Sequence, residues 1–103
     1  MNAREDLNRL RAKLDLVDEE LLGLMNQRKE LGIEIGQLKH QNAEAGPIRQ
    51  PERERSVLHR LENLNAERGG ILTPADLKIL WGALFTVSRN AQEKQVTIPS
   101  PPD

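Results

Sequence analysis

A repeat of aliphatic residues in the first forty positions constrains the fold more than any other feature of the chain. Aliphatic side chains recur at the alternating three- and four-residue spacing of a two-stranded helical seam. The positions are Leu7, Leu10, Leu14, Val17, Leu21, Leu24, Arg28, Leu31, Ile35 and Leu38. Only Arg28 interrupts the pattern, with a guanidinium where an apolar side chain is expected. The repeat predicts one very long helix over residues 4–41 and makes Arg28 the first candidate for a functional residue.

This helix is too long to be covered by its own chain. At 1.5 Å per residue it spans about 57 Å, whereas a compact chain of this length is only about 33 Å across. The seam must therefore be buried against something else, and two-fold symmetric homodimers are the commonest protein assemblies. We expect an intertwined helical homodimer in which the two long helices pair antiparallel.

Two shorter helices are predicted after a loop over residues 42–50. Pro51 suits a first helical position, and acids follow it in the first turn of a helix that ends at the glycine pair 69–70. Thr73 is a capping residue for a third helix, with proline next and an acid three positions later. The sequence therefore predicts an all-α chain of three helices, one of them very long.

Composition narrows the functional classes. Fifteen basic and sixteen acidic residues give a net charge of -1, which argues against nucleic acid or an anionic membrane as a partner. Without cysteine, the chain has no disulfide, thiol nucleophile or thiolate metal site. Since the opening residues are charged and no apolar run approaches membrane-spanning length, we expect a cytoplasmic protein. The helical domain should cover residues 1–94, and residues 95–103 should form a Pro-rich disordered tail or a truncated linker.

One face of the long helix carries a candidate binding site. Arg28, Gly32, Ile35 and Lys39 are spaced by four, three and four residues and therefore share this face. A glycine between two cations leaves room for a ligand there. Arg11 lies about 42 Å from Lys39 along the helix, so it can serve the same small site only from a partner chain. If the two-fold axis crosses the midpoint of the helix, the partner's Arg11 falls between Arg28 and Lys39.

Three inward cations suit a small molecule with two carboxylates, because arginine pairs bidentately with carboxylate and keeps its charge when buried. The shorter helices are expected to close the pocket, with Arg53 and Glu54 from one and Ser88 and Gln92 from the other. No histidine, cysteine or carboxylate pair stands out as nucleophile, base or metal ligand, so we expect no metal and no cofactor. Both histidines are expected at the surface.

Three segments of the chain together resemble one known family. They are LRAKLDLVDEELLGLMNQRKELGIEIGQLK, then PERER after the loop, and later ALFTVSRNAQ. In these segments and their spacing the chain resembles the all-helical (AroQ-type) chorismate mutases over residues 4–94. The resemblance implies an intertwined three-helix homodimer that rearranges chorismate to prephenate in the biosynthesis of aromatic amino acids.

The resemblance also implies a set of residues around the substrate. They are Arg11, Arg28, Lys39, Gln50, Arg53, Glu54, Ser88 and Gln92. The partner's Arg11 and Arg28 would bind the two carboxylates, and Lys39 and Gln92 would donate hydrogen bonds to the ether oxygen. Glu54 would accept a hydrogen bond from the ring hydroxyl. Gln50 departs from the family pattern, which has an aspartate there, so the preference at that ring position stays open.

Two alternatives remain from the sequence. The same fold could serve an isochorismate-pyruvate lyase or a mutase for 4-amino-4-deoxychorismate, and Gln50 gives the latter reading slight support. A non-catalytic dimerisation or regulatory module belongs to another class, in which Arg28 would only set the register of the seam. Such a module would tolerate the joint replacement of Arg11, Arg28 and Lys39. The polar residues that keep the phase of the helical stripes argue against it.

Overall fold

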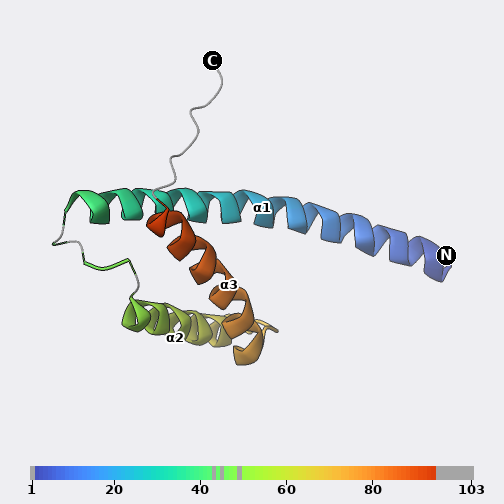
Figure 1. The fold of residues 1–103 in the computed structure, drawn as a ribbon. Coiled ribbons are helices and arrows are strands. Elements are labelled where there is room, and N and C mark those ends of the chain that lie inside the picture. The colour runs from blue at the N-terminus through green and yellow to red at the C-terminus, as the bar shows by residue number, and fades with distance from the viewer. Residues whose placement is uncertain (1, 43, 45, 49, 95–103) are drawn as a thin grey trace, which may run out of the picture.

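Three helices make up the structure, a computed structural model that describes residues 2–42, 44, 46–48 and 50–94. They are α1 (Ala3–Gln41), α2 (Pro51–Glu67) and α3 (Pro74–Glu93), shown in Figure 1. The described residues form no strand, so the prediction of an all-α chain is confirmed. The tail predicted for residues 95–103 lies outside the described residues.

Helix α1 determines the shape of the molecule. It is 39 residues long and is capped by Asn2, whose side chain accepts a hydrogen bond from the backbone nitrogen of Glu5 at 2.8 Å. The molecule is 61 Å long in its greatest dimension. Figure 1 shows that the N-terminal half of α1 extends well beyond the other two helices. The predicted length of this helix is confirmed.

The described part of the chain leaves the apolar seam of α1 largely uncovered. The aliphatic residues of the seam, from Leu7 to Leu38, each expose between 43% and 62% of their surface. A continuous apolar surface of this kind marks an interaction site, because burying it removes water from many side chains at once. Among the described residues, this side of α1 thus remains a large apolar surface exposed to solvent.

The ends of α2 and α3 follow the sequence signals. At the start of α3, Thr73 Oγ1 accepts from the nitrogen of Asp76 at 3.1 Å, and Asp76 Oδ2 accepts from the nitrogen of Thr73 at 3.0 Å. Helix α2 starts at Pro51 and is followed by Gly69, whose φ of +64° is the left-handed conformation that ends many helices. Both predicted starts and the predicted end of α2 are confirmed.

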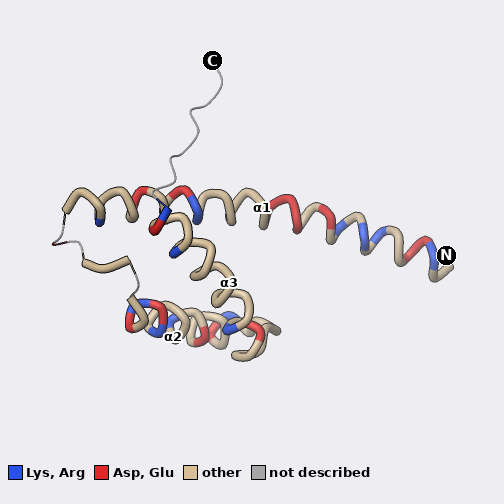
Figure 2. The backbone as a smooth tube through the Cα atoms, viewed as in Figure 1, with Lys and Arg blue, Asp and Glu red and all other residues tan. Residues whose placement is uncertain are grey.

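Helix α3 holds the structure together, because it packs against both α1 and α2. Among the described residues, the buried apolar side chains are Ile33 of α1 and Leu77 and Ala91 of α3. Trp81 is half-buried. Figure 2 shows acidic and basic residues on all three helices, with no helix of a single charge. Within the described residues, none of the helices combines the length and apolar character needed to cross a bilayer.

Candidate active site

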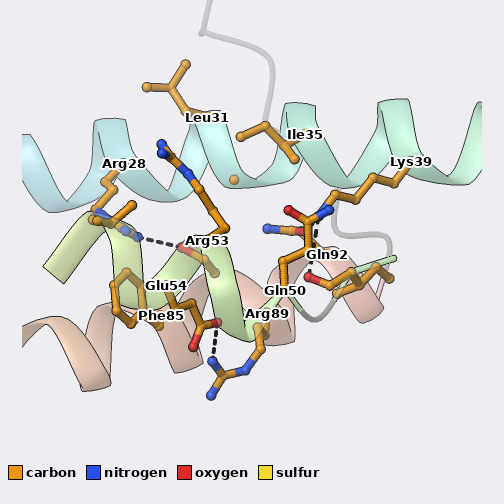
Figure 3. Close-up of a pocket in the computed structure, with 14 residues that line it drawn as sticks. Arg28, Leu31, Ile35, Lys39, Gln50, Arg53, Glu54, Phe85, Arg89 and Gln92 are labelled. Carbon is orange, nitrogen blue, oxygen red and sulfur yellow. Dashed lines mark hydrogen bonds and ion pairs between the residues drawn. The ribbon is translucent and has the colours of Figure 1, made fainter. Parts of the chain in front are cut away.

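A cavity of about 370 Å³ lies between α1, α3 and the start of α2 (Figure 3). The residues that line it are Arg28, Leu31, Gly32, Ile35, Lys39, Ile48, Gln50, Arg53, Glu54, Val57, Phe85, Ser88, Arg89 and Gln92. Every candidate site residue from the sequence except Arg11 is in this set. The candidate residues on one face of α1, at the start of α2 and at the polar end of α3 thus lie around one cavity.

Arg28 is held against α3 by three kinds of contact. Its Nη1 donates to Ser88 Oγ at 2.7 Å and to the backbone oxygen of Leu84 at 3.4 Å. Its guanidinium carbon lies 5.5 Å from the centre of the Phe85 ring, within cation-π range. Burial lowers the pKa of Arg28, and the nearby charge of Glu54 opposes that shift. Arginine remains charged at neutral pH. The cavity therefore keeps a positive charge at the position where Arg28 interrupts the aliphatic repeat of α1.

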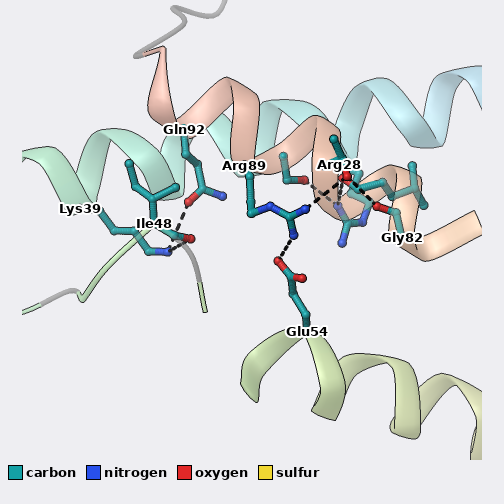
Figure 4. Close-up of polar contacts among 10 residues, drawn as sticks. Arg28, Lys39, Ile48, Glu54, Gly82, Arg89 and Gln92 are labelled. Carbon is teal, nitrogen blue, oxygen red and sulfur yellow. Dashed lines mark hydrogen bonds and ion pairs between the residues drawn. The ribbon is translucent and has the colours of Figure 1, made fainter. Parts of the chain in front are cut away.

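Lys39 and Gln92 form a pair of donors at another point of the cavity wall. The Nζ of Lys39 donates to Gln92 Oε1 at 3.3 Å and to the backbone oxygen of Ile48 at 3.4 Å (Figure 4). Because the amide oxygen of Gln92 accepts from Lys39, the amide nitrogen is left to donate elsewhere. Burial lowers the pKa of Lys39. An ammonium and an amide donor therefore lie side by side.

Two residues of α1 that the sequence analysis did not place in the site fix the backbone of Gln92. A Cβ atom on Gly36 would lie only 2.8 Å from Gln92 Cα, so glycine is needed for the two helices to approach this closely. The ring Nε2 of His40 lies 2.8 Å from the backbone oxygen of Gln92. His40 is exposed, as expected, but it also makes this interhelical contact. The signal was present in the sequence, since Gly32, Gly36 and His40 are four residues apart.

Gly32 lies at the wall of the cavity, beside Ser88 of α3. A Cβ atom there would meet Ser88 Oγ at 3.4 Å, an ordinary contact distance. The space beside Gly32 is thus shared between the cavity and the side chain of Ser88, and does not belong to a ligand alone. Gly32 lines the cavity, and the expectation that it leaves room for a ligand stays a prediction.

Glu54 is paired with an arginine that the sequence analysis missed. Arg89 Nη1 donates to Glu54 Oε2 at 2.5 Å, and the two side chains are 25% and 26% exposed. Arg89 Nη2 also donates to Thr86 Oγ1 at 3.2 Å. Arg89 could have been found from its spacing, because Phe85, Arg89 and Gln92 share one face of α3. The ion pair links α2 to α3 at the edge of the cavity.

Gln50 and Arg53 line the cavity from the start of α2. Gln50 holds the cap position of α2, but its side chain makes no capping hydrogen bond and contributes to the cavity wall. Its Nε2 lies 2.9 Å from where a Cβ atom of Gly46 would be, at a backbone φ of +93° that glycine adopts readily. Arg53 is exposed, and Figure 3 shows its side chain reaching from α2 toward α1.

Arg11 does not take part in this cavity. It is exposed on α1, seventeen residues before Arg28, which corresponds to about 26 Å along the helix axis. The sequence analysis excluded a contribution within one chain for the same reason. Its assignment to the site of a partner chain stays a prediction.

The charge of the cavity indicates the class of ligand. Four lining residues are cations (Arg28, Lys39, Arg53 and Arg89), and one, Glu54, is an anion. Among the described residues, no group of three or more His, Asp or Glu could hold a metal ion. Fold and site together define an all-helical protein with a pocket for a small, multiply negative molecule and two donors fixed beside it.

Comparison with known proteins places the chain within this class. Residues 10–93 match the family of type II chorismate mutases, and the chain belongs to that family. It is 34% identical over 92 residues to the bifunctional chorismate mutase/prephenate dehydratase of Aquifex aeolicus, covering 87% of this chain and 25% of that protein. It is 41% identical over 71 residues to the T-protein of Haemophilus influenzae, covering 69% of this chain and 18% of that protein.

The enzyme of the same bifunctional description from Escherichia coli K12 is 39% identical over 64 residues, which cover 62% of this chain and 16% of that protein. In these three relatives the match spans a quarter of the length or less. The similarity therefore concerns one domain of proteins that are much longer than the described chain.

Proposed function

We propose that this chain is a chorismate mutase domain that converts chorismate to prephenate by a [3,3]-sigmatropic rearrangement. The observation that carries the proposal is a cavity that combines several cations with the adjacent donors of Lys39 and Gln92. Membership of the type II chorismate mutase family supports it. Residues 1–94 are the proposed catalytic unit.

The reaction requires no acid, base or nucleophile from the site. The rearrangement is unimolecular, so catalysis consists of holding the compact conformer and stabilising charge while the C-O bond breaks. Negative charge develops on the ether oxygen. Donors fixed in advance stabilise that charge more than they stabilise the ground state. Lys39 and Gln92 supply these donors in the proposal.

The remaining lining residues bind and orient the substrate. Arg28, oriented by Ser88, binds one carboxylate bidentately. Arg53 adds positive charge from the opposite wall. Glu54 accepts a hydrogen bond from the ring hydroxyl. Substrate charge and cavity charge are thus complementary.

A second copy of the chain is the proposed partner. The exposed seam of α1 gives each chain an apolar surface that an identical helix can cover. An antiparallel arrangement places the partner's Arg11 between Arg28 and Lys39, where it binds the second carboxylate. Each dimer then holds two equivalent sites.

Turnover of chorismate tests the proposal directly. The purified protein is mixed with chorismate, loss of the substrate's ultraviolet absorbance is followed, and the product is identified by mass. We expect prephenate. The same assay with isochorismate and with 4-amino-4-deoxychorismate separates the alternative reactions, because a lyase releases pyruvate. No turnover of any of the three by a confirmed dimer would favour a non-catalytic module.

A further inference from the structure

We propose that Arg89 is a positioning residue that restricts the site to dicarboxylates whose ring substituent is a neutral hydroxyl rather than an ammonium group. The inference deepens the proposed function and rests on it. Its basis is the ion pair between Arg89 and Glu54, which occupies the one carboxylate among the described lining residues of the cavity.

The geometry fixes how Glu54 is used. Arg89 donates from Nη1 to Oε2 of Glu54 at 2.5 Å, and Thr86 accepts from the other terminal nitrogen of the same guanidinium at 3.2 Å. The arginine is therefore held at two points (Figure 4). The second oxygen of Glu54, Oε1, can still accept a hydrogen bond from a ligand. A hydroxyl needs only this one acceptor.

The charge around Glu54 disfavours a cationic substituent. Besides Arg89, the charge of Arg28 is close enough to interact with Glu54. Gln50, the other acceptor candidate, precedes α2, is neutral and provides no second negative charge. Its neutrality therefore counts against an ammonium group, contrary to the slight support for a 4-amino substrate drawn from the sequence. An ammonium group beside Glu54 would share a single carboxylate with two arginines and would be repelled by both. A hydroxyl carries no charge and avoids this repulsion.

Arg89→Met gives the first test. The substitution removes the positive charge and keeps an unbranched apolar side chain in its place. We expect kcat/KM for 4-amino-4-deoxychorismate relative to chorismate to rise about tenfold, since the freed carboxylate can pair with the ammonium. The rise should disappear in Arg89→Met/Glu54→Gln, where no carboxylate remains. An unchanged ratio in the single variant, or a rise that persists in the double variant, would overturn the inference.

Three further variants separate selectivity from a loss of folding. Lys78→Met removes an exposed cation of the same helix and should leave the ratio as in the wild type. Arg89→Lys keeps a cation within reach of Glu54 and should restore selectivity for the hydroxyl. Glu54→Gln alone should lower the ratio further, because Arg89 is then unbalanced. If Arg89→Met fails to fold, Glu54→Gln still tests the inference, because it leaves Arg89 in place.

Binding measurements distinguish failure of this inference from failure of the proposed function. The probes are a saturated ring dicarboxylate that carries a hydroxyl and its amino counterpart, titrated by calorimetry, since neither can rearrange. Preference for the hydroxyl probe, reversed or abolished in Arg89→Met, would support the inference even if chorismate is not turned over. Equal binding of both probes, or binding of neither, would overturn it whatever the enzyme does with chorismate.

Discussion

At the scale of single residues, the site depends on charged groups that are partly removed from water. Burial lowers the pKa of both Arg28 and Lys39, because desolvation disfavours their charged forms. For arginine the shift has no consequence at neutral pH, since its ordinary pKa is far higher. For lysine the shift brings the loss of charge closer to the working range. Arg28 therefore stays charged near neutral pH, whereas the charge of Lys39 is more sensitive to a rise in pH.

Removing either donor should reduce turnover while the fold persists. Loss of one preorganised donor to developing charge typically costs about 3 kcal/mol, or on the order of a hundredfold in rate. We expect Lys39→Ala and Gln92→Ala each to lower kcat by about that factor in steady-state assays. Sedimentation and circular dichroism provide the control for assembly and folding. Near-normal turnover in either variant would remove that residue from the mechanism.

The lowered pKa of Lys39 should be visible in the pH dependence. Deprotonation removes the positive charge as pH rises through the pKa, so kcat/KM should fall on the alkaline side below the ordinary lysine range. A bound dianion stabilises the ammonium, so the matching fall in kcat should occur at higher pH. Lys39→Arg should lack this alkaline limb, because its guanidinium stays charged. The same alkaline limb in both proteins would assign it to another group.

At the scale of secondary-structure elements, α3 positions the site because it packs against both other helices. The contact between α1 and α3 is close where Gly36 faces Gln92 and looser where Gly32 faces Ser88. His40 adds a hydrogen bond to the backbone of α3 one turn beyond Gly36. Small residues and one hydrogen bond thus set the separation of the helices at the end where Lys39 and Gln92 meet.

Gly36→Ala should separate α1 from α3 at this point. The new Cβ atom would lie 2.8 Å from a backbone atom of Gln92, and such overpacking costs about 1–3 kcal/mol. The higher helix propensity of alanine offsets about 1 kcal/mol of that. We expect a lower free energy of unfolding in urea and a lower kcat, because Gln92 is displaced.

Gly82→Ala is the matched control on α3. Within the described residues no atom outside its local backbone lies within 4 Å of the added Cβ, so only the gain in helix propensity applies. This variant should keep its kcat and unfold at slightly higher urea concentration. If Gly36→Ala behaved in the same way, the close approach at Gly36 would not control the site.

At the scale of the whole molecule, the uncovered seam and the position of Arg11 point to the same assembly. The seam residues of α1 are exposed along the full helix, and Arg11 lies far from the cavity of its own chain. In the proposed antiparallel dimer the seam would be buried, and the partner's Arg11 would reach the cavity. Activity and assembly are then linked by one helix.

Mixing two inactive variants tests this shared site. Arg11→Ala and Arg28→Ala homodimers should each be nearly inactive, because every site lacks one arginine. After unfolding and refolding together, half of the dimers are mixed, and one site in each mixed dimer has both arginines. We therefore expect about a quarter of the wild-type activity to return. If Arg11 served the site of its own chain, mixing would restore nothing.

The sequence alone was enough to predict the helices and many of the residues that line the cavity. The seam, the capping Thr73 and the glycines after α2 are local signals, and local signals determine where helices begin and end. Helical periodicity likewise predicted that Arg28 and Lys39 share a face. These conclusions depend on spacing along one helix, which the sequence displays directly.

Only the tertiary structure decided which groups meet across helices. The pairing of Arg89 with Glu54, the contact of His40 with Gln92 and the close approach at Gly36 join residues more than thirty positions apart. Such contacts depend on how α3 crosses α1 and α2, and periodicity along a single helix contains no information about that crossing. The packing of the helices decides which residues pair between them, because packing sets the distances at which charges and hydrogen bonds act.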